Sequence, residues 1–418
     1  MLQIRLFLVA FMLLRTVSFR FIQPIKRYAV LSKMTTFKMK GDHYPQSLDF
    51  TSILRTVSEL QYLKPSKVEN IFQEDACSLY IALRTDQLHW IHINWNSKFS
   101  WIALAQSPTR SKTHRLSLES TLTSFLQDMY LTDLSIPDER NRVVRLGFSD
   151  KIAQSPKYNL FVEIMGAKAN IALVDARSSL ILACGYQVAA GRSKGGRETN
   201  SDTSMPTKQR VLQISGKYEP PPVFTFDEDL SNLSDLTRKL TEGTMSYYGA
   251  YSVLLRSSPA ISPNIVHSIL RAVNLESSSS TKSTTQYLSD PQIRSIVDIY
   301  SLWNASYWNG IPPNTMPSVT QCGFQIQPTP HVFQVTDRDG SQKSFYSPIQ
   351  FTQDPITSPK PNPTRLVDFL KEHYAIAYRA YLFSSLRTEC DRALSKRLDK
   401  ADRLLSKLEA MERERTYV

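Results

Sequence analysis

The sequence predicts an α+β protein with a β-rich N-terminal domain, a helical middle domain and the start of a C-terminal coiled coil. Three observations support this prediction. Short segments rich in β-branched and aromatic residues, several of them alternating in polarity, fill 68–105 and 141–186. Helical periodicity replaces them in 230–308. Near the C-terminus, apolar residues recur in steps of four and three, as in a coiled coil.

Size and composition narrow the class of protein. The 418 residues are 41% hydrophobic, which suggests two or three domains with sizeable cores and excludes wholesale disorder. The chain lacks an apolar run of the length that spans a bilayer, so we expect no stable membrane insertion. The four cysteines are too scattered for a zinc knuckle or a redox pair. Glycine is scarce, which argues against Gly-rich phosphate loops.

The net charge of +12 is concentrated at the N-terminus. Residues 1–41 contain eight basic residues and no acidic one, so the rest of the chain carries only +4. The body is mildly basic, and its charge alone identifies no polyanionic partner.

This N-terminal segment has the composition of a targeting leader. An apolar run of nine residues, LFLVAFMLL, is followed by a basic, hydroxylated and acid-free stretch. The combination resembles the bipartite leaders of plastid proteins in algae with complex plastids, so we expect an organelle, plastid rather than mitochondrion. The alternative is a start codon at Met34 or Met39, which leaves the protein in the cytosol.

The N-terminal elements follow in order. Apolar residues at helical spacing predict an opening helix over 48–63. Four strands of an antiparallel meander are predicted next, then a helix over 116–130, then four more strands. These segments are VENIFQ, CSLYIALRT, LHWIHINWN and FSWIALA before the helix, and NRVVRLGFS, YNLFVEIMG, ANIALVDA and LILACGY after it. VDARSSL is typical of a hairpin turn, and 191–222 is predicted to be a loop.

The second half is predicted to be mainly helical. Four helices are expected within 230–308, two of them capped by Ser234 and Ser289. Two short strands flank the turn DRDG within 322–351, and a proline-rich hinge occupies 355–363.

The C-terminal helix is predicted to carry an apolar stripe. Its members are Leu394, Leu398, Ala401, Leu405 and Leu408. A solitary charged helix buries little apolar surface, so we expect 391–418 to project with the stripe exposed. We further expect this form to be a fragment whose downstream sequence supplies a facing helix.

Several blocks, in order, resemble the NFACT family. They are VENIFQEDACSLYIALR, SKFSWIAL, NRVVRLGF, YNLFVEIMGAKANIALVDARSSLILACGYQV, RVLQISGKYEPPP, SPNIVHSILRAVNL and SFYSPIQFTQ. The resemblance implies an N-terminal domain similar to the first domain of formamidopyrimidine-DNA glycosylases and a helix-hairpin-helix-like middle domain. It divides the chain into a leader (1–41), an NFACT N-terminal domain (47–226), a helical middle domain (227–312), short strands and a Pro-rich hinge (313–363) and a truncated coiled-coil helix (364–418).

The resemblance also implies a function. Family members act in ribosome-associated quality control: they bind a large ribosomal subunit obstructed by peptidyl-tRNA, recruit tRNA and extend the stalled nascent chain without a template. The expected partners are therefore the large ribosomal subunit, tRNA and the peptidyl-tRNA nascent chain complex. The alternative is a degenerate adaptor that keeps the fold but binds only proteins.

Candidate tRNA- and rRNA-binding residues come partly from the resemblance and partly from charge. The family's Asp-Arg pair falls on Asn141-Arg142, where the arginine keeps a donor fork for phosphate but the asparagine carries no charge. This replacement leaves open whether tailing survives. The complete set is Asn141, Arg142, Lys157, Lys168, Arg192, Lys194 and Arg197.

Other departures from the family pattern weaken the expected affinity for RNA. Gln127-Asp128 replaces a basic pair of the family, and the segment SSPAISP lacks the glycine of a phosphate-binding hairpin. No enzyme, metal or cofactor is expected. The sequence contains no HExxH, and His89 and His92 should point to opposite faces of one strand.

Overall fold

The computed structural model describes twelve segments of the chain. They are 48–108, 117–138, 141–187, 210–221, 232–242, 246–258, 261–275, 287–307, 325–327, 330–336, 342–352 and 365–416. The chain divides into two units, Met1–Asp42 and His43–Val418. The first unit, which holds the predicted leader, lies outside the described residues.

The structure is α+β, as predicted, and begins with a buried helix. Helix α2 (Phe50–Glu59) is followed by a single turn of 3-10 helix, η1 (Gln61–Leu63), within the predicted range. Asp49 caps α2, because its carboxylate accepts a hydrogen bond of 2.7 Å from the backbone N–H of Ser52.

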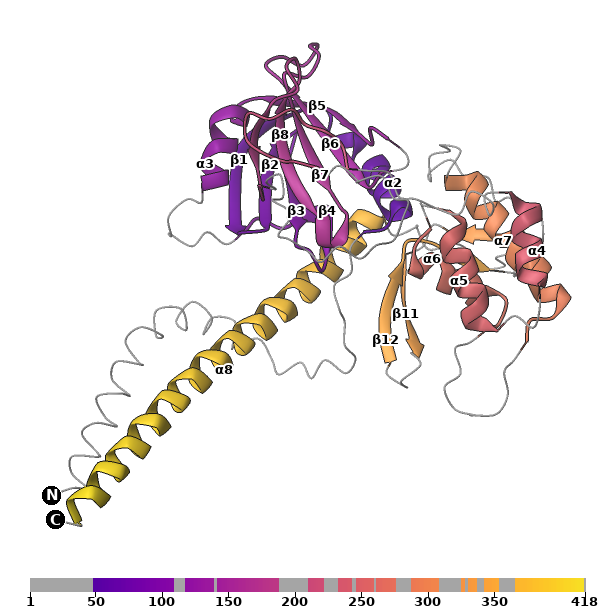
Figure 1. Cartoon of the computed structure of the whole chain (residues 1–418). Coiled ribbons are helices and arrows are strands. Elements are labelled where there is room, and N and C mark those ends of the chain that lie inside the picture. Colours follow the sequence, from indigo (N-terminus) through magenta and orange to yellow (C-terminus); the bar gives the residue numbers. More distant parts are fainter. Residues whose placement is uncertain are drawn as a thin grey trace, which may run out of the picture. The chain divides into compact units, whose positions relative to one another are not determined.

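A nine-stranded antiparallel sheet follows (Figure 1). Its strands are β1 (Ser66–Asp75), β2 (Ser78–Arg84), β3 (Leu88–Trp95), β4 (Ser100–Ala105), β5 (Tyr130–Ser135), β6 (Val143–Ser149), β7 (Tyr158–Glu163), β8 (Asn170–Asp175) and β9 (Ile181–Cys184). Their order is β4-β3-β2-β1-β5-β6-β7-β8-β9. All eight predicted strands are confirmed.

The sheet consists of two halves that share one core. Only two residue pairs join β1 to β5, Ser66 with Leu131 and Lys67 with Tyr130. Apolar side chains of both halves pack into a single buried cluster, and β3 contacts β7 across it. The halves therefore pack face to face around this core.

Strand β5 was not predicted, and the predicted helix over 116–130 is too long. Helix α3 (Ser117–Leu126) ends four residues earlier, and Tyr130 already belongs to β5. The strand lacks an alternating pattern because its pairing with β6 shifts register between Leu131 and Asp133.

The hairpin predicted at VDARSSL is confirmed between β8 and β9. The Asp175 carboxylate accepts hydrogen bonds from the backbone N–H groups of Arg177 and Ser178, and Ser179 takes a left-handed conformation. Residues 210–221 lie against this hairpin through a bridge between Leu180 and Lys217.

Four predicted helices follow. They are α4 (Leu233–Thr241), α5 (Tyr247–Ser257), α6 (Pro263–Ala272) and α7 (Asp290–Tyr307), and they share a second buried cluster. The predicted cap Ser234 is wrong, because Asn232 caps α4 by accepting from the Ser234 N–H. Ser289 precedes α7 as predicted, and the Gln292 side chain accepts from its backbone N–H at 3.0 Å.

Two pairs of short strands come next. β11 (His331–Thr336) pairs with β12 (Gln342–Ser347), which confirms the two predicted strands, and β10 (Gln325–Gln327) pairs with β13 (Gln350–Thr352). The turn DRDG and the predicted hinge at 355–363 lie outside the described residues.

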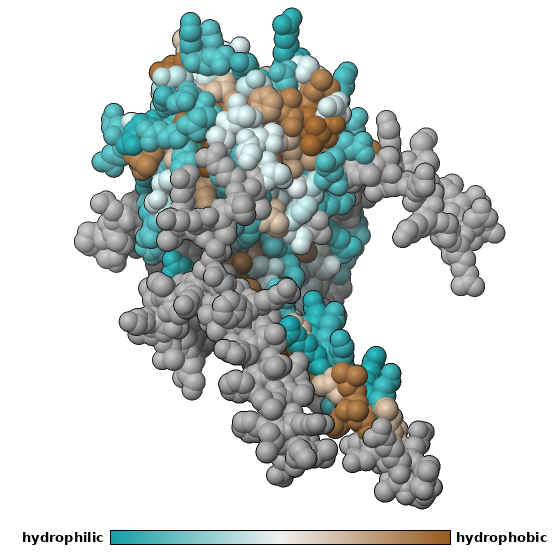
Figure 2. All heavy atoms as spheres, turned by 90° about the vertical axis from the view of Figure 1, so that its left-hand side faces the viewer, coloured by the Kyte–Doolittle hydropathy of each residue, from teal (hydrophilic) through white to brown (hydrophobic). Residues whose placement is uncertain are grey.

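Helix α8 (Leu366–Thr416) is 51 residues long, or about 75 Å at the rise of an α-helix. The predicted stripe is exposed: Leu398 and Leu408 each expose 63% of their surface. Figure 2 shows such hydrophobic side chains among polar ones on this helix. No helix among the described residues combines the length and apolarity that crossing a membrane requires.

Candidate nucleic-acid interface

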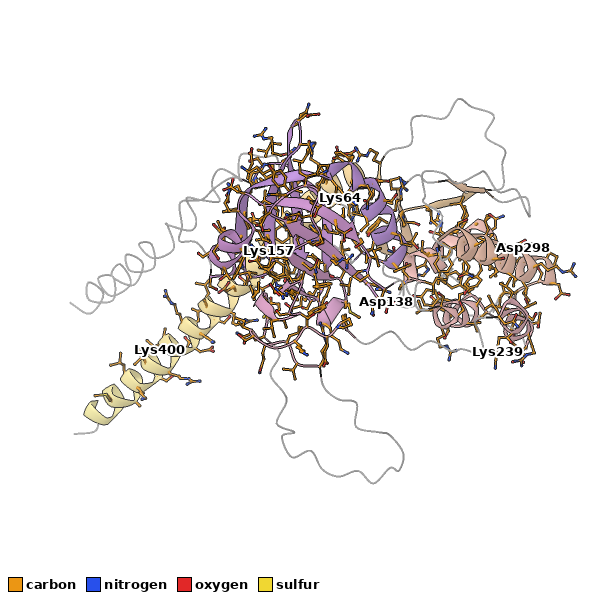
Figure 3. The ribbon with its side chains drawn as sticks, turned by 90° about the horizontal axis from the view of Figure 1, so that it is seen from above. Lys64, Asp138, Lys157, Lys239, Asp298 and Lys400 are labelled. Carbon is orange, nitrogen blue, oxygen red and sulfur yellow. The ribbon has the colours of Figure 1, made fainter. Side chains whose placement is uncertain are left out.

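The sheet separates the candidate residues into two groups at its opposite ends. Val143 pairs with Glu163, and Glu163 pairs with Asn170, so Asn141-Arg142 and Lys168 lie at one end. Tyr158 and Asp175 pair at the other end, next to Lys157. In Figure 3 the labelled Lys157 and Asp138 lie apart accordingly. We name these the Lys168 end and the Lys157 end.

At the Lys157 end, acidic side chains pair with Lys157 and with two further cations. The Lys157 ammonium lies 3.2 Å from the Asp150 carboxylate and 5.4 Å from the centroid of the Tyr158 ring. The hydrogen bond to Asp150 raises the pKa of Lys157, with Tyr158 contributing. Two more pairs lie nearby, Lys67 with Asp128 at 2.9 Å and Arg84 with Glu69 at 2.7 Å. A phosphate at this end would have to compete with these carboxylates.

Asp128 shows how a departure from the family pattern is built into the fold. Gln127 and Asp128 follow the end of α3 and are not part of the helix. Gln127 donates a 2.8 Å hydrogen bond to the Glu69 carbonyl, and Asp128 takes a left-handed backbone conformation with φ of 66°. The residue that stands where the family has a cation thus neutralises Lys67.

Asn141 and Arg142 face the interior. Asn141 is 2% exposed, and its amide donates to the Asp138 carboxylate at 3.3 Å. The half-buried Arg142 accepts a hydrogen bond from the Ile164 N–H through its carbonyl. Burial lowers the pKa of Arg142, while the Asp49 carboxylate opposes the shift. That these two residues contact tRNA stays a prediction.

Arg142 lies near a polar junction between the sheet and the later helices. Asp49, the cap of α2, also accepts a 2.6 Å hydrogen bond from Ser262, the cap of α6. The Trp303 indole N–H of α7 donates to the Thr51 hydroxyl of α2 at 3.1 Å. Sequence periodicity carries no information on such tertiary partners, so this environment was not predicted.

Lys168 is exposed in the loop between β7 and β8. It ends the single turn η2 (Gly166–Lys168), which begins at Gly166 with φ of +58°, a left-handed conformation that glycine adopts without strain. The loop lies beside the β3–β4 turn, because a Cβ placed on Gly166 would be 4.0 Å from the Ser97 carbonyl oxygen. The exposed Lys98 of that turn was not among the predicted residues, although its position between two predicted strands indicated a turn.

The candidates Arg192, Lys194 and Arg197 lie outside the described residues. The chain on either side of them is firmly held. On the C-terminal side, the Arg210 guanidinium donates to both carboxylate oxygens of Glu163, at 2.8 and 2.5 Å, and the Tyr218 hydroxyl donates at 2.9 Å. The Glu163 side chain is fully buried, so these bonds compensate a charge removed from water.

On the N-terminal side, the Asn170 side chain holds Tyr186. Its amide oxygen accepts from the Tyr186 N–H at 2.9 Å, and its amide nitrogen donates to the Tyr186 carbonyl at 2.8 Å. Glu163 ends β7 and Asn170 begins β8, so both anchors belong to the Lys168 end. The described residues on both sides of this segment therefore lie at the Lys168 end.

The two histidines point to opposite faces of β3, as predicted. His89 lies edge-on to Tyr62, whereas His92 is buried. The Trp101 indole donates to His92 Nδ1 at 3.2 Å, so the neutral ring carries its hydrogen on Nε2 and donates to Ser78, 2.6 Å away. Burial lowers the pKa of His92 to about 3. Within the described segments, no three potential ligands gather around a possible metal.

The base of α8 packs on an aromatic cluster of the sheet. Tyr374 stacks on Trp101 at 4.3 Å between ring centroids, and Tyr381 meets Phe99 edge-on at 4.5 Å. The Tyr378 hydroxyl donates to the Asp75 carboxylate. Trp95 and Trp101 are fully buried and belong to the core of the sheet.

The Glu59 carboxylate of α2 holds the start of this helix. It accepts a 3.0 Å hydrogen bond from the backbone N–H of Val367, in the first turn of α8. It also accepts from Arg55 at 2.7 Å, so its charge is compensated. Helix α8 is thus anchored by both polar and aromatic contacts.

This arrangement of sheet, helices and long C-terminal helix defines the class of protein. The chain matches the family described as NFACT N-terminal and middle domains over residues 49–415. The chain belongs to the NFACT family.

The chain is also similar to solved structures of bacterial fibrinogen- and fibronectin-binding proteins. The fibrinogen-binding protein of Staphylococcus aureus is 17% identical, covers 78% of this chain and 98% of its own, and gives a TM-score of 0.47. The N-terminal part of the fibronectin/fibrinogen-binding protein of Streptococcus suis is 17% identical, with 78% and 99% covered and a TM-score of 0.47. The N-terminal domain of PavA from Streptococcus pneumoniae is 20% identical, with 78% and 98% covered and a TM-score of 0.36. Among curated proteins, none matches the sequence.

Proposed function

We propose that this chain is an RNA-binding factor of ribosome-associated quality control. In this proposal it binds a large ribosomal subunit obstructed by peptidyl-tRNA, contacts tRNA and helps to rescue the stalled nascent chain. The observation that carries the proposal is membership of the NFACT family over nearly all of the described chain.

The charges of the Lys168 end support an RNA partner. Lys98 and Lys168 are exposed, and neither makes an ion pair with a residue that the structure describes. Phosphate contacts supply much of the affinity of proteins for nucleic acids, and they require cations that are not already neutralised. Lys157, Lys67 and Arg84 at the Lys157 end do not meet this condition, because each is paired with a carboxylate.

The proposed role is binding, without chemistry of the chain's own. Ser78, whose hydroxyl lies 2.6 Å from His92 Nε2, is fully buried, and no substrate carbonyl would reach it there. Whether tailing accompanies binding depends on Asn141, whose amide cannot form the ion pair that the family's acidic residue allows.

Sedimentation tests the proposal. Cells expressing the tagged full chain are treated to stall translation, and lysates are fractionated on a sucrose gradient. We expect the protein in large-subunit fractions after stalling and a clear reduction without it. Equal amounts at the top of both gradients would argue decisively against the proposal.

A second candidate is an adaptor that binds only proteins. It is favoured by the burial of Asn141 and by the ion pairs of Lys67 and Lys157, which remove possible RNA contacts. Ultraviolet crosslinking in cells separates the two, because an RNA-binding factor yields rRNA or tRNA adducts and an adaptor yields none.

The compartment is part of the same proposal. The leader at 1–41 supports an organelle, plastid rather than mitochondrion, with cytosol as the alternative if translation starts at Met34 or Met39. A fluorescent reporter fused after residue 45 should enter the organelle. A diffuse cytosolic signal would refute organellar import.

A further inference from the structure

The Lys168 end carries an exposed tyrosine, Tyr186, which contacts from neighbouring residues hold in place. Asn170 holds both backbone groups of Tyr186, and the Tyr186 hydroxyl lies 2.5 Å from the Cys77 thiol sulfur. The preceding Gly185 packs so tightly that an added Cβ would lie 2.4 Å from Trp95 Nε1. Even so, 44% of the Tyr186 surface is exposed. A large ring held rigidly at its rim and open to solvent has the geometry of a stacking platform.

The two exposed lysines lie in the same region. Tyr186 contacts Asn170, two residues after Lys168, and η2 in turn lies beside the β3–β4 turn that carries Lys98. The Lys98 ammonium is 5.9 Å from the ring centroid of Tyr381. A continuous series of contacts therefore connects the tyrosine to both lysine-bearing loops.

The carboxylates of Asp75 and Glu74, which precede Cys77 in the chain, are engaged away from the lysines. Asp75 accepts hydrogen bonds from the Cys77 N–H and the Tyr378 hydroxyl. Glu74 accepts from Tyr80, and burial raises the pKa of its carboxyl. Neither forms an ion pair with Lys98 or Lys168, so the two ammonium groups keep their attraction for an anion.

From this geometry we infer that Tyr186, Lys98 and Lys168 form a binding site for single-stranded RNA. Tyr186 stacks on one unpaired base, and the two lysines contact phosphates beside it. The inference rests on the proposed function and adds to it the class of RNA and the residues. A duplex is disfavoured because its bases are already stacked, and a lone aromatic ring cannot reach between them without unstacking.

Fluorescence anisotropy with the full chain tests this inference. The probes are a labelled single-stranded RNA of about 12 nucleotides, within the site sizes of such domains, the same sequence as a duplex, and a labelled glutamate-rich peptide. We expect Tyr186→Ala to weaken single-strand binding about ten-fold or more, as loss of one base–aromatic stack does, and Tyr186→Phe to keep it. In the double variant Lys98→Gln/Lys168→Gln, the negative slope of log K against log salt should become less steep by about 1.4.

Matched control variants show whether a loss of RNA binding is specific to these three residues. Tyr62 is also 44% exposed but lies beside His89, so Tyr62→Ala should leave RNA binding unchanged. Lys157→Gln removes an already paired cation and should leave the salt slope nearly unchanged. Circular dichroism melts establish which variants fold, and Tyr186→Leu replaces Tyr186→Ala if the latter does not.

The outcomes separate the two levels of the proposal. If the unmodified chain binds neither RNA, both the proposed function and this site are overturned. If it binds single-stranded RNA and the Tyr186 and lysine variants bind equally well, only this site is overturned. Preference for the duplex or for the acidic peptide would likewise overturn the site.

Discussion

Acidification should destabilise the fold through the buried His92. The pKa of His92 is lowered to about 3 in the folded chain, whereas an unfolded histidine titrates near 6.5. Unfolding therefore takes up a proton at any pH between these values. The stability that neutral His92 contributes is fully present above pH 6.5 and is lost as the pH falls towards 3.

The size of the effect follows from these two pKa values. Between pH 7 and pH 5 the free energy of unfolding should fall by about 2 kcal/mol from this residue alone. An effect of this size requires that the ring stays neutral at pH 5 in the folded chain. It depends on His92 staying buried between Trp101 and Ser78, because burial keeps the ring neutral.

Urea unfolding followed by tryptophan fluorescence measures this loss, since Trp95 and Trp101 are buried in the same core. The comparison is with His92→Gln, which can still accept from Trp101 but does not titrate. Between pH 7 and pH 5 the parent should lose about 2 kcal/mol more than this variant. His89→Gln, on the opposite face of β3, should behave like the parent. Equal pH dependence in the parent and His92→Gln would refute the reasoning.

Three further substitutions test the packing. Arg210→Met leaves the buried Glu163 charge uncompensated and should cost about 3 kcal/mol, most of which Glu163→Gln should restore in the double variant; additive losses in denaturant melts would contradict this. Gly185→Ala should cost about 2 kcal/mol, because its Cβ would overlap the Trp95 indole; an unchanged melting temperature would count against the packing described. Leu398→Glu, on the exposed stripe of α8, should change stability by less than about 0.5 kcal/mol in thermal melts, and a larger loss would mean that the stripe is covered.

The sequence was informative where local pattern and burial agree. The four strands before α3 and four of the five after it were recognisable, because each alternates or is continuously apolar against one core. Strand β5 was missed because its two buried residues, Leu131 and Leu134, are three apart, and a register shift restores their common orientation. The cap of α4 was misplaced by two residues because Asn232 and Ser234 both suit that position.

The site was harder to predict than the fold. Strand spacing could not show that Lys157 lies at the opposite end of the sheet from Lys168, because this depends on the order of strands. It could not show that Asn141 is buried either, since burial depends on how the whole chain packs in three dimensions. The anchors of Tyr186 and Arg210 combine residues from β7, β8 and later segments, so only the three-dimensional structure reveals them.

The proposal that this chain recognises an obstructed large ribosomal subunit is tested most directly by a binding experiment. Purified full chain is mixed with large subunits that carry peptidyl-tRNA or with vacant large subunits, and each mixture is pelleted through a sucrose cushion. The account predicts that the chain pellets with the obstructed subunits and that competing tRNA or high salt reduces the pelleted amount. A chain that stays in the supernatant with both kinds of subunit would contradict it.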